Sequence, residues 1–458
     1  MRDGSLSAVD LLRSCLAASD TLGGPLNAFA SRASAESLLA AAEAIDLRRA
    51  RGEDPGALAG IPIGVKDIFQ TRDLPTTGSS KAFAGHFPRM DAEAVARLRG
   101  AGCLVVGKTQ THELAFGPTT ANEYAGASRN PWNPEHVPGG SSGGSAIAVA
   151  TGMCLGATAS DTGGSIRHPA AFCGVTGLKP TYGRVSRRGV FALAWSLDHA
   201  GPIARTVDDV AHLLQAMACH DPEDPGSADV PVPDYVAGVL EPPERLRIGI
   251  PREHYFDVID PDMRAAFDAA IATLEGLGWS VEPVSLPRIR YALGAELAIL
   301  SAEAAAYHRR TIRERGGDIS PNVRREIDTG ETILATDYLQ GQRARRLVAD
   351  DFAAALAEVD LLATPTIPIP APRIGQTTVT LDGKEVSALD AIWRNAFPTN
   401  LTGSPTLSIP CGFSSGGLPL GLQLIGRNFD EMTVLRAGHA FQSVTDWHAR
   451  RPPVTGAG

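Results

Sequence analysis

The sequence predicts an α/β fold, because segments with helical periodicity alternate with short apolar runs that suit buried strands. Two of these apolar, strand-like runs are residues 103–106 (CLVV) and 247–251 (RIGIP). Residues 261–277 are predicted to form a helix, because apolar side chains recur every three or four positions after Pro261 and Asp262, which suit a helix start. The chain has 458 residues, of which 43% are hydrophobic, so it can bury a large core without disulfides or metals.

The first half of the chain is predicted to begin with helices and to continue with strands and loops. An apolar face at residues 11–16 and an Ala-rich segment at 33–50 predict two helices. Residues 56–68 (GALAGIPIGVKDI) are apolar but broken by Gly and Pro, which favours strand and loop. Residues 91–100 are predicted to be helical, and residues 145–156 to form a helix of small side chains.

The second half is predicted to be largely helical, with strands near the C-terminus. Residues 220–245 are rich in Asp and Pro, and we interpret them as a surface excursion within one domain. Residues 290–358 are mostly helical and charged, whereas 360–366 (DLLATPT) and 406–410 (TLSIP) read as strands.

Composition argues against several classes of protein. The net charge is −9 without a basic stripe, so we expect no nucleic-acid partner. The six cysteines show no CxxC spacing, so we expect neither a metal nor a redox cofactor. No apolar run of membrane-spanning length and no secretory leader is found. We therefore expect a cytoplasmic protein that has no membrane contact and needs no cofactor.

One short motif is misleading. Residues 102–109 (GCLVVGKT) match the pattern of a phosphate-binding loop. Such a loop must turn its N–H groups inward between a strand and a helix. Here the four central residues are themselves a predicted strand, whose N–H groups bond within a sheet, so we do not expect nucleotide binding at Lys108.

Two glycine-flanked serine clusters, GGSSGG at 139–144 and DTGGS at 161–165, point to nucleophilic catalysis. Merely flexible loops would have polar surroundings, but a small-residue apolar segment joins the two clusters. Glycine beside a serine lets a substrate carbonyl approach backbone N–H groups without a Cβ in the way, as an oxyanion hole requires. The region therefore predicts a nucleophilic serine.

Such a serine needs a base, and the residues leave its identity open. Histidine is the usual base, but His168, three residues after Ser165 and next to a proline, equally suits a packed polar residue. Lys66 follows an apolar run, which disfavours the ammonium form and lowers the pKa of the side chain. An ion pair between Lys66 and Asp67 at a strand end fits the same residues equally well.

Taken together, the motifs GIPIGVKD, GGSSGGS, DTGGSIR and GLKPTYGR resemble the amidase signature family. The resemblance extends to RNPWNPEHVPGGSSGG, SLDHAGPIARTVDD and GLPLGLQLIG, and so covers nearly the whole chain. It implies one large twisted mixed β-sheet covered by helices on both faces, with residues 1–458 as a single domain. Residues 56–210 would form the signature core, and residues 290–400 a variable helical region that controls substrate access.

The resemblance also implies catalytic roles. The family's nucleophile falls on Ser165, its bridging serine on Ser141 behind a cis peptide from Gly140, and its lysine on Lys66. The oxyanion donors would be the backbone N–H groups of four consecutive residues: Thr162, Gly163, Gly164 and Ser165.

Supporting and substrate-binding residues are implied in the same way. Ser142 and Arg167 would brace the two loops, and Ala115 and Phe116 would lie nearest the acyl pocket. An aromatic side chain such as Phe116 is nevertheless common in a core. Three further aromatic residues either line a pocket or simply pack: Trp195, Trp393 and Phe397.

The complete Lys–Ser–Ser set predicts a stand-alone amidohydrolase that releases an amine or ammonia from a small amide, aryl amides included. Carbamates and esters present a similar carbonyl to the same groups. The alternative is the glutamine-hydrolysing A subunit of a tRNA-dependent amidotransferase, which resembles this chain through the same signature and passes ammonia to a partner. The intact set argues against a non-catalytic scaffold. The sequence does not decide whether the protein forms a homodimer.

Overall fold

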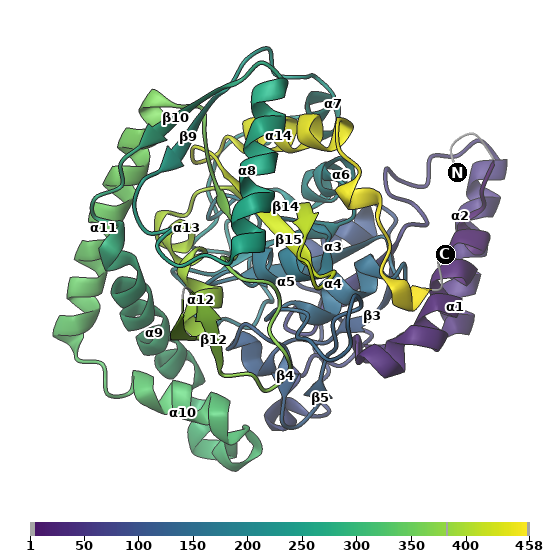
Figure 1. The fold of residues 1–458 in the computed structure, drawn as a ribbon. Helices are drawn as coiled ribbons and strands as arrows, with labels where there is room; N and C mark the ends of the chain where they lie inside the picture. The colour runs from purple at the N-terminus through teal and green to yellow at the C-terminus, as the bar shows by residue number, and fades with distance from the viewer. Residues whose placement is uncertain (1–4, 382, 456–458) are drawn as a thin grey trace.

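An 11-stranded sheet runs through the computed structural model, which describes residues 5–381 and 383–455 (Figure 1). The strands follow one another across the sheet in this order: β1 (Phe29–Arg32), β3 (Leu104–Thr109), β2 (Pro62–Lys66), β6 (Gly156–Asp161), β8 (His199–Ala204), β7 (Thr176–Lys179), β14 (Thr406–Phe413), β15 (Pro419–Ile425), β11 (Leu361–Pro365), β9 (Arg247–Pro251) and β10 (Ser280–Val284). Both parallel and antiparallel neighbours occur, so the sheet is mixed, as the resemblance implied. Two small hairpins lie outside it: β4 (Ala121–Asn122) with β5 (Gly126–Ala127), and β12 (Thr378–Leu381) with β13 (Lys384–Ser387).

Helices cover both faces of this sheet, which confirms the α/β prediction. Their bounds are α1 (Ala8–Leu26), α2 (Ala35–Ala50), α3 (Glu93–Gly100), α4 (Gly143–Ala150), α5 (Arg167–Cys173), α6 (Val207–Met217), α7 (Tyr235–Val239), α8 (Pro261–Gly276), α9 (Ala292–Arg315), α10 (Pro321–Gly330), α11 (Ala335–Glu358), α12 (Ala388–Arg394), α13 (Phe397–Thr402) and α14 (Glu431–Ser443). Across the described residues, no helix combines the length and the apolar character that crossing a bilayer needs.

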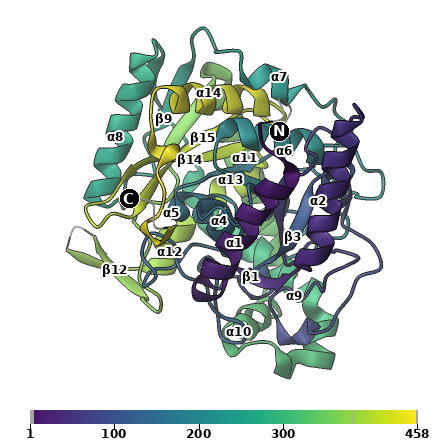
Figure 2. The same ribbon diagram turned by 90° about the vertical axis from the view of Figure 1, so that its right-hand side faces the viewer.

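Alternation along β3 shows how both faces of the sheet become apolar. Val105 packs in one cluster with α3, α6, α8 and α14, whereas Leu104 and Val106 pack with α1, α2, α4 and α5. Successive side chains of a strand point to opposite faces of the sheet, so all four side chains of CLVV are apolar because both faces are covered by helices. Figure 2 shows the second of these faces, with α1 and α2 in front.

The helices α9, α10 and α11 form a layer of their own along the left and lower left of Figure 1, which we call the helical layer. Its core combines side chains such as Ile299, Val323 and Phe352 from the three helices. This layer corresponds to the predicted helical segment 290–358. α13 packs on both α9 and α11, and its Leu401 shares a hydrophobic cluster with Ile425 of β15, which connects the layer to the sheet.

The predicted helix at residues 145–156 is wrong in its second half. α4 ends at Ala150, Gly152 takes a left-handed φ of +75°, and β6 begins at Gly156. Small side chains are compatible with either structure, and pairing of β6 with β2 and β8 decides for the strand. The correction matters because β6 leads directly into the second serine cluster.

Candidate active site

The ends of β2 and β6 bring distant segments of the chain together. These strands are parallel neighbours, with Gly64 opposite Ala157. Parallel strands end at the same edge of a sheet, so Lys66 at the end of β2 lies beside the stretch that ends at Asp161. The backbone N–H of Lys66 donates to Thr158 Oγ1 at 3.0 Å, which ties the two strands together next to the site.

Lys66 is fully buried, and its ammonium faces two hydroxyls rather than a carboxylate. Its Nζ donates to Ser141 Oγ and to Ser160 Oγ, each at 2.7 Å. Burial lowers the pKa of Lys66 to about 7, against the opposing charges of Asp161 and Asp198. In a large fraction of the protein molecules, Lys66 is therefore uncharged near neutral pH and can accept a proton.

Ser141 is fixed through its backbone. The Gly140–Ser141 peptide is cis, as the resemblance implied. The Ser141 carbonyl accepts hydrogen bonds from Thr111 Oγ1 at 2.8 Å and from the backbone N–H of His112 at 3.0 Å. These contacts hold the residue while its hydroxyl accepts the hydrogen bond from Lys66.

Ser165 lies in the loop between β6 and α5 and is only 8% exposed. Its carbonyl accepts the backbone N–H of Ser142 at 3.3 Å, and the Ser142 hydroxyl donates to the carbonyl of Ser160 at 3.3 Å. Ser142 thus joins the two serine loops, in the bracing position that was predicted. The structure contains no hydrogen bond between the hydroxyls of Ser141 and Ser165, and such catalytic contacts often tighten only when substrate binds.

The oxyanion loop differs from the expectation in one donor. The N–H of Gly164 donates to Asp161 Oδ1 at 2.7 Å, so a carboxylate within the chain occupies it. Within the described residues, no hydrogen bond engages the N–H groups of Thr162, Gly163 or Ser165. These three N–H groups remain candidates to stabilise an oxyanion, and the inclusion of Gly164 is corrected.

A buried ion pair holds this loop. Arg167 donates through Nε to Asp161 Oδ2 at 3.0 Å and through Nη2 to Asp161 Oδ1 at 2.9 Å. It also donates to Thr399 Oγ1 at 2.7 Å and to Asn400 Oδ1 at 2.6 Å, which fastens the loop to α13. Burial alone would raise the pKa of Asp161, but the charge and hydrogen bonds of Arg167 hold it well below its usual value. Arg167 therefore fastens the second serine loop to α13, and no hydrogen bond between described residues joins its side chain to the first serine loop, which it was also predicted to brace.

The structure resolves the alternatives left open for the base. Asp67 pairs with Lys108 at 3.4 Å and not with Lys66. The ring of His168 packs on the oxyanion loop, because a Cβ on Gly164 would lie 2.1 Å from it. Lys108 lies on β3 and donates to the carbonyl of Phe69 at 2.7 Å, so the apparent phosphate-binding motif is a buried strand.

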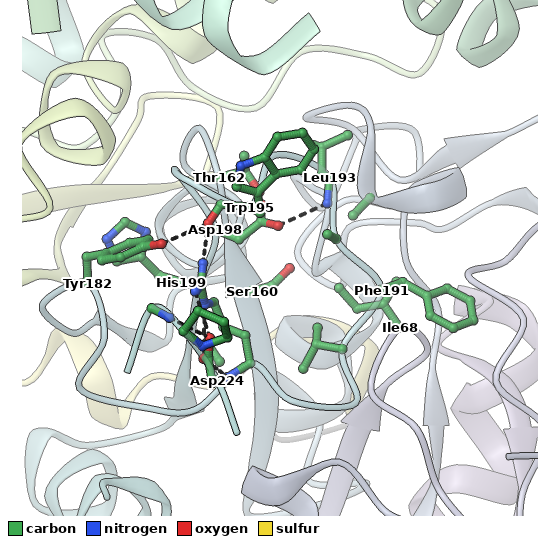
Figure 3. A pocket seen from close by; sticks show the side chains of 17 residues that line it. Ile68, Ser160, Thr162, Tyr182, Phe191, Leu193, Trp195, Asp198, His199 and Asp224 are labelled. Atoms are coloured by element: carbon green, nitrogen blue, oxygen red, sulfur yellow. Dashed lines mark hydrogen bonds and ion pairs between the residues drawn. The ribbon is translucent and has the colours of Figure 1, made fainter. Parts of the chain in front are cut away.

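One cavity of about 360 Å³ is lined by Ser160, which accepts a hydrogen bond from Lys66, and by Thr162 of the oxyanion loop (Figure 3). Asp198 lines it and accepts hydrogen bonds from Thr162 Oγ1 at 2.6 Å and from the N–H of Leu193 at 3.0 Å. Burial raises the pKa of Asp198 to about 6. The predicted Ala115 and the half-exposed Trp195 also line this cavity.

A second cavity of about 400 Å³, which we call the vestibule, contains the other predicted substrate-binding residue, Phe116. Trp393 lines it and stacks on Phe397, with ring centroids 5.7 Å apart. Phe397 is buried and packs on the oxyanion loop, since a Cβ on Gly163 would lie 2.6 Å from its ring. The predicted pair Ala115 and Phe116 therefore faces two different cavities.

Three residues of the site were missed by the sequence reasoning. Asp161 stood in the quoted DTGGS cluster and Asp198 in SLDHAG, but neither was given a role. Ser160 carried no signal apart from its place just before that cluster. In the described part of the chain, no group of three or more His, Cys, Asp or Glu side chains could hold a metal ion.

A mixed sheet with this Lys–Ser–Ser site defines an amidohydrolase, and comparison with known proteins agrees. The family model described as Amidase matches residues 10–435. The chain therefore belongs to the amidase signature family, as its motifs predicted, and is an enzyme of the amidohydrolase type.

Individual relatives narrow the class. The chain is 44% identical to the A subunit of the glutamyl-tRNA(Gln) amidotransferase of Chloroflexus aggregans, over 99% of this chain and 96% of the relative. The solved structure of the corresponding protein from Thermotoga maritima is 34% identical, with a TM-score of 0.81 over 96% of this chain and 95% of the other. A structure described as an unexpected vestigial protein complex that reveals the origins of an s-triazine catabolic enzyme is 37% identical, with a TM-score of 0.92 over 96% of both chains.

These relatives overturn two expectations. A stand-alone amidohydrolase of small or aryl amides was expected, but the full-length relatives are named as subunits of an amidotransferase. The expectation of no nucleic-acid partner is wrong on the same finding, since those names include a tRNA. The net charge of a chain indicates only whether its own surface suits contact with phosphates. It does not indicate whether other subunits of an assembly bind RNA, and this is why the expectation failed.

Proposed function

We propose that this chain is the glutamine-hydrolysing A subunit of a tRNA-dependent amidotransferase. The observation that carries the chemistry is the 2.7 Å contact between Lys66 Nζ and Ser141 Oγ, made by a buried lysine whose pKa is lowered to about 7. The choice of glutamine rests on relatives with that name that are 41% to 46% identical over nearly the whole chain.

The proposed reaction begins when uncharged Lys66 takes a proton from Ser141, which takes one from Ser165. Ser165 Oγ then attacks the side-chain amide carbon of glutamine, and the oxyanion accepts hydrogen bonds from free N–H groups such as that of Gly163. Each such donor contributes about 3–4 kcal/mol to lowering the barrier. The C–N bond breaks as the proton returns to nitrogen, so ammonia leaves and a glutamyl ester remains on Ser165. Water attacks this ester through the same relay and releases glutamate.

In this proposal the ammonia is consumed by a partner that holds glutamyl-tRNA. One member of a tRNA-dependent assembly can be acidic overall, because another subunit supplies the phosphate contacts. We expect the protein to act in the cytoplasm, in keeping with six cysteines that are all free thiols.

The test is to measure glutamate and ammonia released from L-glutamine by the purified chain, alone and with the other subunits and glutamyl-tRNA. We expect activity that rises with the partners and that falls on the order of 10⁴-fold in Ser165→Ala. Ser443→Ala, at the end of α14 and outside both cavities, is the matched control. Hydrolysis of anilides by the isolated chain, with no activity on glutamine under any condition, would refute the proposal.

A further inference from the structure

The vestibule adjoins both loops of the catalytic relay. His112 and Thr119 line it, and the backbone N–H of His112 also holds the carbonyl of Ser141. Trp393 also lines it and stacks on Phe397, which packs against the oxyanion loop. A molecule in this cavity therefore lies one layer of residues away from the reacting serines, behind His112 and Phe397. A cavity of about 400 Å³ suits a small substrate rather than a macromolecule.

Of the charged side chains that line the vestibule, one is paired within the protein and one is free to contact a bound molecule. Two charged side chains line it, those of Glu326 and Arg373. Arg373 forms an ion pair with Glu135, so its charge is already matched. Glu326 is exposed and makes no ion pair or hydrogen bond with any described residue. Burial, followed by the charge of Lys66, lowers the pKa of His112 to about 4, so this ring is neutral at pH 7.

A second oxygen acceptor stands beside Glu326. Asn322 lies four positions earlier on α10, so the two side chains share one face of the helix, and both line the vestibule. The Oδ1 atom of Asn322 is shielded from solvent and has no hydrogen-bond partner among the described residues. Buried acceptors are normally satisfied, so this one is available to a donor on a bound molecule.

We propose that Asn322 and Glu326 form a subsite for a positively charged amino group of the substrate, at the end remote from the amide that is cleaved. The class of substrate is thus a small amide that carries an ammonium group. This rests on the proposed function, where the group is the α-ammonium of glutamine, and it deepens that function by locating how the amine is recognised. An anionic group at the same place would meet the like charge of Glu326.

The test compares three amides of the same length: 5-aminopentanamide, which is cationic, pentanamide, which is neutral, and 4-carbamoylbutanoate, which is anionic. We expect kcat/KM to decrease in that order. Glu326→Gln should lower the preference for 5-aminopentanamide over pentanamide about tenfold, mainly through KM, since a charge-assisted hydrogen bond is lost. Glu326→Arg should invert the preference in favour of the anionic amide. Glu331→Gln, an exposed glutamate just beyond α10, is the matched control and should keep the wild-type order.

Binding separates this inference from the proposed function. In the Ser165→Ala protein, which cannot turn substrate over, calorimetry should still detect 5-aminopentanamide and L-glutamine, and Glu326→Gln added to it should weaken both. If glutamine is not hydrolysed but the cationic amide binds through Glu326, the amidotransferase proposal fails and the subsite stands. If glutamine is hydrolysed and Glu326→Gln leaves both preference and binding unchanged, the subsite is refuted. If 5-aminopentanamide neither reacts nor binds, the subsite is also refuted.

Discussion

The strand ends that carry Lys66 and the helical layer beside them differ in how their buried carboxylates are matched. At the strand ends, Asp161 is matched by Arg167 and Lys66 by two hydroxyls. In the helical layer, both carboxylate oxygens of Glu296 and both ring nitrogens of His308 are buried without a hydrogen-bond partner among the described residues. The difference teaches that the catalytic side chains are pre-organised by fixed partners, whereas the helical layer beside them keeps an unmatched buried carboxyl group.

Breaking the matched pair should have the largest effect. Arg167→Met leaves Asp161 charged, buried and unpaired, so we expect the free energy of unfolding to fall by about 3–5 kcal/mol. Chemical denaturation of the variant measures this loss. The double variant Asp161→Asn/Arg167→Met removes the stranded charge and should recover part of it. Equal stability of wild type and Arg167→Met would remove the contrast between the two regions.

The lowered pKa of Lys66 predicts how activity depends on pH. The proton acceptor is the uncharged amine, which is lost as pH falls below its pKa of about 7. We therefore expect kcat/KM to fall about tenfold per pH unit below pH 7 and to level off above pH 8. A pH–rate profile on a neutral amide such as pentanamide isolates the enzyme's own groups. A flat profile from pH 5 to pH 8 would contradict a lysine base.

Replacement of Glu296 tests the unmatched side of the comparison. Burial raises the pKa of Glu296 well above its usual value, against the charges of Arg345 and Arg167, so folding favours the neutral form of the group. The unfolded chain ionises it above its ordinary pKa of 4.5, so wild-type stability contributed by this group is present below that pH and is lost as pH rises. Glu296→Gln should therefore be about 1–3 kcal/mol more stable than wild type at pH 8 and about equal at pH 4. Thermal unfolding at both pH values would show it, and a variant less stable at pH 8 would indicate an ionised Glu296.

The smallest effect is expected from Asp198, which lines the first cavity and acts on Lys66 through its charge. Its negative charge raises the pKa of Lys66, so Asp198→Asn should shift the acidic limb of the pH–rate profile to lower pH by less than about one unit. Asp224→Asn changes a carboxylate of the same cavity that pairs with Arg187, and it serves as the control. A shift to higher pH in Asp198→Asn would mean that this carboxylate does not influence the relay through its charge.

The part of the site that could be predicted is the part written in contiguous motifs. The serine clusters with their flanking glycines indicated a nucleophile from chemistry alone, and the resemblance to a family added the roles of Ser141 and Lys66. Two errors had local causes: residues 151–156 are too small to distinguish helix from strand, and the N–H of Gly164 is engaged by a carboxylate three residues earlier. The choice between acting alone and acting in an assembly is not encoded in the catalytic motifs, and the names of the relatives favour the second.

The sequence by itself determined the alternation of helices and buried strands and the residue types of the relay, because periodicity and short motifs are local properties. Only the tertiary structure decided that Lys66 meets Ser160 instead of Asp67, since this depends on the pairing of β2 with β6 across about 90 residues of chain. It likewise decided that Asn322 and Glu326 face a cavity beside the catalytic loops. Such contacts follow from packing between distant segments, on which the local pattern of side chains carries no information.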